Sequence, residues 1–302
     1  MFKGKISLLF VTACVAVIPA LAQDQQQPPP PPPPEGQQYP PPPPPPPPEG
    51  QQAPPQPYAQ LDQLVARIAL YPDPLLAQVL TASTFWNQIP EAAQWANQHA
   101  YLRGDQLAGA IQEDNLPWDP SVQALLPFPS VLDMMARDPG WTSALGNAVL
   151  AQRPDVMDAV QQRRQEAMNY GYLQTNPYDR VVPTPGAIEI LPVNPAYIYV
   201  PTYNPGIVFV APRRGFFVGG AIGFGPGIVL GASFAPWGWG GPGFGWREHS
   251  ILIDRRPWDR TWVNRGRYVH PYAAPYRAAG PRVEHHEVHG RPEHERGREQ
   301  HR

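Results

Sequence analysis

The sequence predicts an α+β protein, in which a multi-helix α module precedes a small antiparallel β meander and a glycine-rich apolar segment. Apolar residues recur at helical spacing over residues 61–172, and β-branched and aromatic runs recur at about ten-residue spacing over residues 187–210. The 45 prolines and 26 glycines gather mostly outside these two regions. Such clustering is typical of a chain that is only partly globular, so we expect disordered tails at both ends.

The first 22 residues have the three parts of a secretory signal peptide. Two lysines lie within the first five residues, an apolar run covers residues 6–18, and residues 20–22 read Ala-Leu-Ala before a polar stretch. The apolar run is too short for a comfortable membrane-spanning helix. We therefore expect cleavage after Ala22 and an exported protein, periplasmic or secreted and associated with the envelope.

An alternative export route would use the single cysteine, Cys14. The residues Val-Thr-Ala before it resemble a lipoprotein box, in which the cysteine is acylated and becomes the new N-terminus. Against this, few apolar residues precede Cys14 and the apolar run continues after it. Cleavage after Ala22 would leave no thiol, which excludes a cysteine nucleophile and any cysteine-bound metal.

Residues 23–57 predict a stiff tether. Two proline runs, at residues 28–34 and 40–48, are each followed by Glu-Gly-Gln-Gln. Polyproline forms an extended left-handed helix that rises about 3.1 Å per residue and has no internal hydrogen bonds. A spacer is the favoured interpretation, and a ligand for an aromatic-lined groove is the alternative.

Residues 58–175 form the predicted α module, with seven or eight short helices. Asp73, Asp119 and Asp138 each precede a proline, and an acidic cap followed by proline marks a helix start. The last helix is predicted from about residue 154 to residue 169. About 110 residues of this kind can bury one modest core.

Three stretches within the module carry a family resemblance. They are ALYPDPLLAQVLTAST at residues 69–84, WDPSVQAL at 118–125 and FPSVL at 128–132. They resemble a family of exported bacterial proteins known as domain of unknown function 3300. The resemblance covers about residues 61–246. It implies an envelope or secreted location, and it carries over no catalytic residues.

Residues 176–214 predict a three-stranded meander with Asn-Pro turns at residues 194–195 and 204–205. Tyr197, Tyr199 and Tyr203 fit either strand packing or a groove for a sugar or peptide. The expected strands lie at residues 187–191, 197–200 and 207–210.

Residues 215–263 predict a Gly/Trp-rich apolar segment with a short β-like end. They begin with an uncharged glycine-rich stretch that ends at residue 246. On a helix its regularly spaced glycines would form one stripe, suited to membrane contact or self-association. Pro226 and additional glycines weaken any helix, so an apolar packing element is the alternative. Three tryptophans fit an interfacial membrane anchor or a hydrophobic lid. The glycines are Gly215, Gly219, Gly223, Gly227 and Gly231, and the tryptophans are Trp237, Trp239 and Trp246.

Residues 264–302 have little periodic apolar character and predict a disordered tail. Histidine-rich tracts can bind zinc, copper or nickel, and we treat four tail histidines as weak candidate metal ligands. They are His285, His286, His289 and His294.

Composition and motifs favour a non-enzymatic envelope protein that acts as a scaffold or interaction module. A net charge of −2 argues against a protein built around nucleic acid. The sequence holds no nucleophile elbow, phosphate loop or dinucleotide fingerprint, so we expect no cofactor. The expected partner is an envelope protein or a cell-wall polymer, with membrane contact through residues 215–246 as a further option. The alternatives are a hydrolase of envelope polymer, whose carboxylates leave no local signature, and a metal-binding protein that uses the tail.

Overall fold

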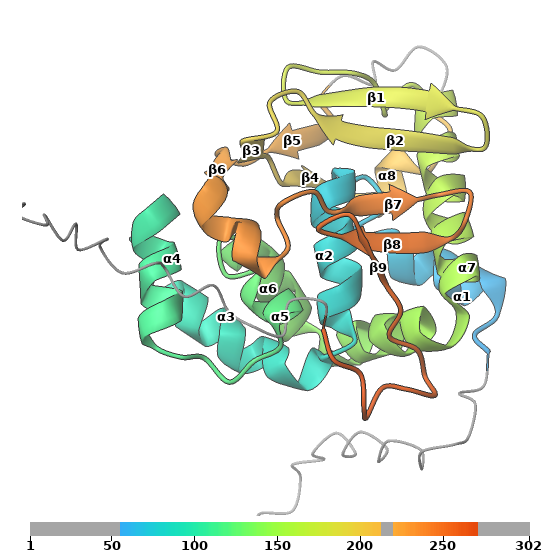
Figure 1. The fold of residues 1–302 in the computed structure, drawn as a ribbon. Helices are drawn as coiled ribbons and strands as arrows, with labels where there is room; N and C mark the ends of the chain where they lie inside the picture. The colour runs from blue at the N-terminus through green and yellow to red at the C-terminus, as the bar shows by residue number, and fades with distance from the viewer. Residues whose placement is uncertain (1–54, 213–219, 271–302) are drawn as a thin grey trace, which may run out of the picture. The chain divides into compact units, whose positions relative to one another are not determined.

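A computed structural model describes residues 55–212 and 220–270, which belong to the compact unit Pro45–Arg302 (Figure 1). Helices and short antiparallel strands share one hydrophobic core, which confirms the predicted α+β class. Several expectations lie outside the described residues. These are cleavage after Ala22, lipidation of Cys14, the proline runs of the tether, Gly215 and Gly219 of the glycine stripe, and the four histidines of the tail.

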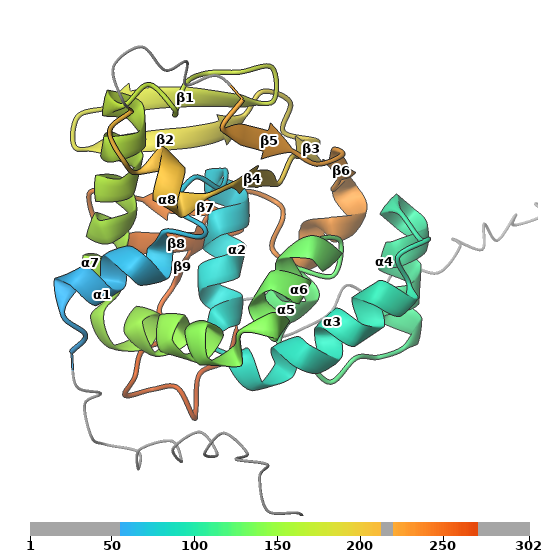
Figure 2. The same ribbon diagram turned by 180° about the vertical axis from the view of Figure 1, so that it is seen from behind.

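The predicted α module is present as a series of helices. The longest, α7, rises along one side of the body to the β1–β2 hairpin, while α4 lies on the other side of the body (Figures 1 and 2). The helices are α1 (Tyr58–Val65), α2 (Asp73–Ser83), the 3-10 turn η1 (Trp86–Gln88), α3 (Ile89–Gln98), α4 (Gly104–Glu113), α5 (Pro120–Gln123), α6 (Pro129–Arg137) and α7 (Pro139–Asn169).

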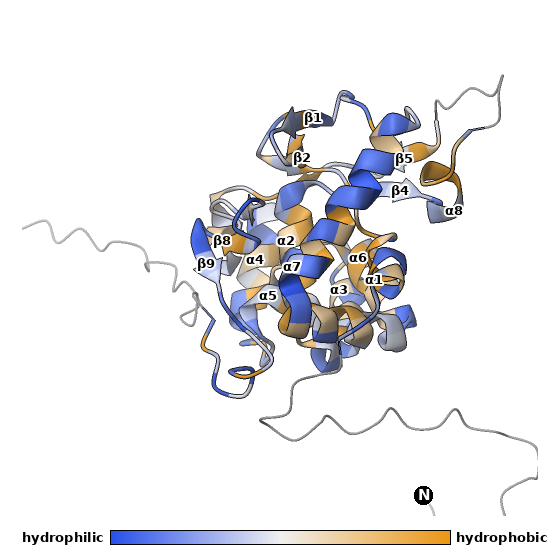
Figure 3. Ribbon diagram, turned by 90° about the vertical axis from the view of Figure 1, so that its right-hand side faces the viewer, coloured by the Kyte–Doolittle hydropathy of each residue, from blue (hydrophilic) through white to orange (hydrophobic). Residues whose placement is uncertain are grey.

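Helix α2 is the central element of the core. Nearly every residue along it is buried, including the polar residues Gln78 and Thr81, whereas α7 carries a hydrophilic strip on its outer face (Figure 3). Helix α7 approaches the end of α2 closely at Gly146. A β-carbon at this position would overlap the carbonyl oxygen of Ser83, so the contact requires glycine.

Helix α7 is kinked where the sequence predicts a new helix start. Gln152 has non-helical dihedral angles (φ −146°, ψ 50°), and Pro154 follows it. Because Pro154 has no N–H, the carbonyl of Leu150 lacks its usual helical donor. That carbonyl accepts instead from the amide of Trp262, at 2.9 Å. The Gln152 side chain also bonds both backbone groups of Gln56, at 2.7 and 3.2 Å.

Two of the three predicted aspartate caps are confirmed. Asp119 accepts from the amide of Ser121 at 2.9 Å, and Asp138 accepts from the amide of Trp141 at 3.0 Å. The third prediction is wrong, because α2 begins at Asp73 itself, whose side chain makes no cap hydrogen bond. Its carboxylate turns into the core and pairs with Arg164.

The β region consists of antiparallel pairs rather than the predicted meander. Asn204 caps a short helix, α8, by accepting from the amide of Gly206 at 2.9 Å, so the strand expected at residues 207–210 is wrong. Asparagine before proline marks a helix start as well as a turn. The pairs are β1 (Asp179–Thr184) with β2 (Ala187–Pro192), β3 (Tyr197–Ile198) with β6 (Ile228–Val229), and β4 (Pro201–Tyr203) with β5 (Ile222–Phe224); α8 spans Pro205–Val208.

The described part of the glycine-rich segment does not form a helical stripe. Gly223 lies in β5, Gly227 lies against the ring of Tyr199, and Gly231 precedes the 3-10 turn η2 (Ala232–Trp237). Strand pairing with β3 and β4 satisfies this backbone, which is why it is not helical. Among the described residues, no helix combines the length and apolarity needed to cross a bilayer.

The three tryptophans of this segment pack inward. The indole N–H of Trp237 donates to the Gln123 side chain at 2.8 Å, and that of Trp239 donates to the Ala124 carbonyl at 3.0 Å. The indole N–H of Trp246 donates to the Asp73 carboxylate at 3.0 Å. These bonds fix the segment to α2 and α5, so the tryptophans do not form the exposed belt that an interfacial anchor requires.

A three-stranded sheet and a following segment complete the described body. The segment packs inward: Arg260 donates to the carbonyl and the hydroxyl of Thr84 at 2.8 and 2.7 Å, and His270 is buried. The start of the predicted tail at residue 264 is therefore wrong for residues 264–270. The sheet has the order β7-β8-β9, with β7 (Gly243–Gly245), β8 (Ser250–Ile253) and β9 (Arg256–Trp258).

Candidate functional site

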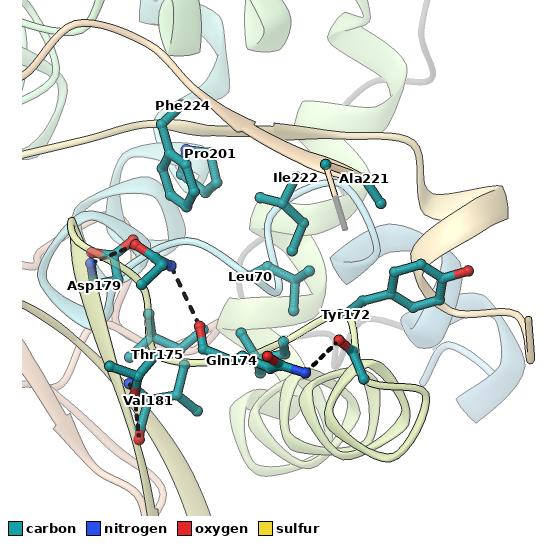
Figure 4. Close-up of a pocket in the computed structure, with 15 residues that line it drawn as sticks. Leu70, Tyr172, Gln174, Thr175, Asp179, Val181, Pro201, Ala221, Ile222 and Phe224 are labelled. Carbon is teal, nitrogen blue, oxygen red and sulfur yellow. Dashed lines mark hydrogen bonds between the residues drawn. The ribbon is translucent and has the colours of Figure 1, made fainter. Parts of the chain in front are cut away.

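A pocket of about 280 Å³ lies between the end of α7, the β1–β2 hairpin and the β4–β5 pair (Figure 4). Most of its wall is apolar and a few polar groups converge on it, which is the usual composition of a ligand site. The apolar lining includes Leu70, Val181, Ile190, Ile222 and Phe224, and the polar lining includes Gln174, Thr175, Asn176 and Asp179.

The loop between α7 and β1 builds one side of the pocket. Gly171 ends α7 in the left-handed region, at φ 79°, which glycine adopts without strain. Thr175 bonds both backbone groups of Val181, at 3.0 and 3.3 Å. The Asn176 side chain accepts from the amides of Tyr178 and Asp179, both at 2.9 Å. This loop is therefore fixed by its own side chains before any ligand arrives.

Asp179 is the distinctive group of the pocket. Its residue surface is 3% exposed, and its Oδ1 has no hydrogen-bond partner in the part of the chain described. Burial raises the pKa of this carboxyl from its ordinary value of 3.8 to about 7. Asp179 faces Pro192 across the hairpin, and proline has no amide N–H to offer. The carboxyl therefore exchanges a proton near neutral pH inside a largely apolar cavity.

A buried ion pair lies behind two apolar wall residues of the pocket, Leu70 and Ile190. Arg164 is fully buried and lies 2.7 Å from the carboxylate of Asp73. Its guanidinium also donates to the carbonyls of Ala69 (2.8 Å), Tyr71 (3.0 Å) and Ile188 (2.7 Å). The first two carbonyls flank Leu70, and the third lies two residues before Ile190. Arg164 thus positions two wall residues without entering the pocket.

A second hollow, of about 480 Å³, lies between α7 and the turns of two hairpins. Here the Nε2 of His249 lies 2.9 Å from a carboxylate oxygen of Asp158, and Glu189 and Glu248 line the same groove. The His249 and Asp158 side chains are 35% and 56% exposed, so water screens their attraction. No set of three candidate metal ligands gathers anywhere in the described ranges. The pocket around Asp179 is the stronger candidate because its charge is buried and unmatched.

Comparison with known proteins places the chain in a family. The model of the family described as "Protein of unknown function (DUF3300)" matches residues 57–250, which is more than half of the chain. The chain belongs to the DUF3300 family. The resemblance found in the sequence is confirmed, and both Asp179 and Arg164 lie within the matched range.

One relative of the chain is the protein described as "Uncharacterized protein YacH" of Escherichia coli strain K12. It is 36% identical over 183 residues, which cover 50% of this chain and 29% of YacH. The alignment therefore spans less than a third of the relative's length. No solved structure matches the chain.

The sequence analysis identified neither Asp179 nor Arg164. Asp179 carries no local motif, because its environment comes from strands and loops that are distant in sequence. Arg164 had a signal, since it continues the buried face of α7 that includes Val156 and Val160 at four-residue steps. A cation on an apolar helix face predicts a buried partner. Of the three tyrosines weighed for a groove, Tyr203 accepts from the amide of Leu70 at 3.3 Å.

Proposed function

We propose that the chain is an exported protein of the cell envelope whose folded body binds a partner or ligand and catalyses no reaction. The pocket around Asp179 is the observation that carries this proposal. Its described lining offers one carboxyl, apolar walls and backbone-fixed polar groups, which suit recognition. Hydrolysis of a glycan would call for a second carboxyl across the cavity, and Asp179 is the single acidic residue among the described lining residues.

The preformed loop supports a binding role. An enzyme that closes a loop over its substrate would need a loop that orders only on binding. The bonds from Thr175 and Asn176 hold the pocket rim in the ligand-free protein, so little ordering entropy remains to be lost on binding. The proposed location rests on the signal-like N-terminus. The tether behind it would keep the binding body at a distance from its attachment point.

The location is tested by fractionating cells that express the full chain and measuring the intact mass of the recovered protein. We expect a species that begins at Gln23 in the periplasmic or envelope fraction. A cytoplasmic species that retains its first 22 residues would contradict export. A lipid mass on Cys14 would agree with export but would show that the chain is processed at Cys14 and not after Ala22.

Binding is tested with the chain from Gln23 onward, mixed with purified peptidoglycan sacculi or with vesicles of envelope lipid. Ala221→Phe fills the pocket from its lining, and Ala59→Phe on the exposed face of α1 is the matched control. We expect co-sedimentation that Ala221→Phe weakens at least tenfold and Ala59→Phe leaves unchanged. Release of soluble glycan or peptide fragments from sacculi would contradict a non-catalytic role.

A further inference from the structure

We propose that the pocket binds an alkylammonium or guanidinium group, as carried by a lysine or arginine side chain or by an amino-bearing cell-wall peptide. The cation would lie against Asp179 and its methylene stem against the apolar walls. This inference rests on the proposed function, because it names the ligand class of the same site.

The unmatched carboxyl is the first argument. A buried charge is strongly unfavourable unless it is paired, and an ionised Asp179 has no counter-charge within the pocket. Arg180, the next residue of β1, is exposed, and successive side chains of a strand point to opposite faces. Tyr172 is the other titratable residue among the described lining residues. A ligand that brings a positive charge supplies what the pocket lacks.

The size and the walls are the second argument. A pocket of about 280 Å³ lies just below the usual range for ligand sites, about 300–1,000 Å³, which suits one side chain better than a larger molecule. Leu70, Ile190 and Ile222 offer apolar surface to a methylene stem, whose transfer out of water favours binding. Lysine and arginine combine such a stem with a charged end.

An aromatic wall residue is the third argument. Phe224 lines the pocket, and its ring packs against that of Tyr178, with 4.8 Å between the ring centroids. Aromatic faces attract ammonium and guanidinium groups, most strongly where water is excluded. Phe224 therefore adds a second attraction of the same sign as that of the carboxylate.

The proton on Asp179 gives the proposal a measurable signature. Burial raises the pKa of this carboxyl to about 7, so at lower pH a bound cation must displace a proton. Affinity for a cation then rises with pH up to about 7 and becomes constant above it. Between about pH 5 and about pH 8 the expected gain in affinity is about 100-fold, since each pH unit below the pKa weakens binding about tenfold.

The experiment is isothermal titration calorimetry of the chain from Gln23 onward with three probes. Nα-acetyl-lysine amide carries the cation, its Nε-acetylated form removes the charge, and Nα-acetyl-norleucine amide keeps only the stem. We expect the lysine probe to bind about 100-fold more tightly at pH 8 than at pH 5. We expect the two neutral probes to bind at least tenfold more weakly than the lysine probe at pH 8.

Asp179→Asn is the decisive variant, with Asp158→Asn on the exposed face of α7 as its matched control. Asp179→Asn is expected to weaken the lysine probe at pH 8 and to remove the pH dependence, while Asp158→Asn changes neither. Should Asp179→Asn unfold, Ala221→Phe gives the same test by blocking the cavity. Equal binding of the lysine and norleucine probes, or a pH dependence that survives in Asp179→Asn, would overturn the cation proposal.

The outcomes separate the ligand class from the function. Suppose that a neutral probe binds, that Ala221→Phe abolishes this binding, and that the lysine probe does not bind. This outcome refutes the cation proposal but leaves the proposed binding function standing. If no probe binds and Ala221→Phe leaves sedimentation with envelope material unchanged, both the cation and the role of this pocket in binding fail.

Discussion

Asp179→Asn is expected to change how the free energy of unfolding depends on pH. In the folded protein burial raises the pKa of Asp179 from 3.8 to about 7, while in the unfolded chain water restores the ordinary value. Between these two values the folded state holds a proton that the unfolded state releases. Stability therefore falls as pH rises through this window, by about 4 kcal/mol in all, and is level above it. The asparagine variant lacks this contribution.

The assay is urea unfolding followed by tryptophan fluorescence, at about pH 4 and about pH 8, for the wild type and the variant. The buried amide of the variant has its own unsatisfied groups, but their effect does not depend on pH. The quantity compared is therefore the difference in unfolding free energy between the two proteins at each pH. We expect it to shift by about 4 kcal/mol in favour of the variant at the higher pH. A difference that is the same at both pH values would refute the buried, unpaired state of this carboxyl.

Three further predictions concern stability, each measured by urea unfolding. Gly146→Ala is expected to destabilise the protein by about 1–3 kcal/mol, because its methyl group would overpack against Ser83. The control Gly109→Ala has open space around it and is expected to stabilise the protein by about 0.5–1 kcal/mol. Similar effects at both sites would contradict the close approach of α7 to α2. Arg164→Met leaves Asp73 buried without its cation and is expected to cost about 3–5 kcal/mol, with the exposed Arg137→Met as a near-neutral control. Trp258→Ala is expected to cost about 3–5 kcal/mol, because this side chain is buried; a loss below about 1 kcal/mol would show that residues 256–270 do not belong to the core.

The helices were predictable because their signals are local. Apolar spacing, aspartate caps and prolines at first positions act within one or two turns, and the helices lie where these signals place them. The predictions that were wrong, for Asp73 and for Asn204-Pro205, also relied on local signals. Asp73 has the local signature of a cap, but a distant cation, Arg164, determines where its carboxylate points. Asn204-Pro205 suits both a strand turn and a helix start, and local sequence does not decide between them.

Strand pairing and the pocket were not predictable, because they depend on contacts between distant residues. Strands β3 and β4 pair with β6 and β5, which lie within the glycine-rich stretch. The four-residue glycine spacing suggests a helix, yet the partner strands satisfy that backbone better. Asp179 has no motif, and its unusual environment arises only when α7, the β1–β2 hairpin and β5 meet around it.

The kink in α7 has a mechanical consequence. Gln152 holds the backbone of Gln56, directly after the proline-rich stretch, and the neighbouring Leu150 carbonyl holds the backbone of Trp262 near the other end of the described chain. A pull on the chain before residue 56 is thus resisted first by two side-chain bonds at this joint. The same joint anchors the C-terminal segment, so tension that opened it would loosen both ends of the folded body together. Tension on the chain would therefore act on α7 at its kink near Gln152. The pocket loop follows the other end of that helix, after Asn169.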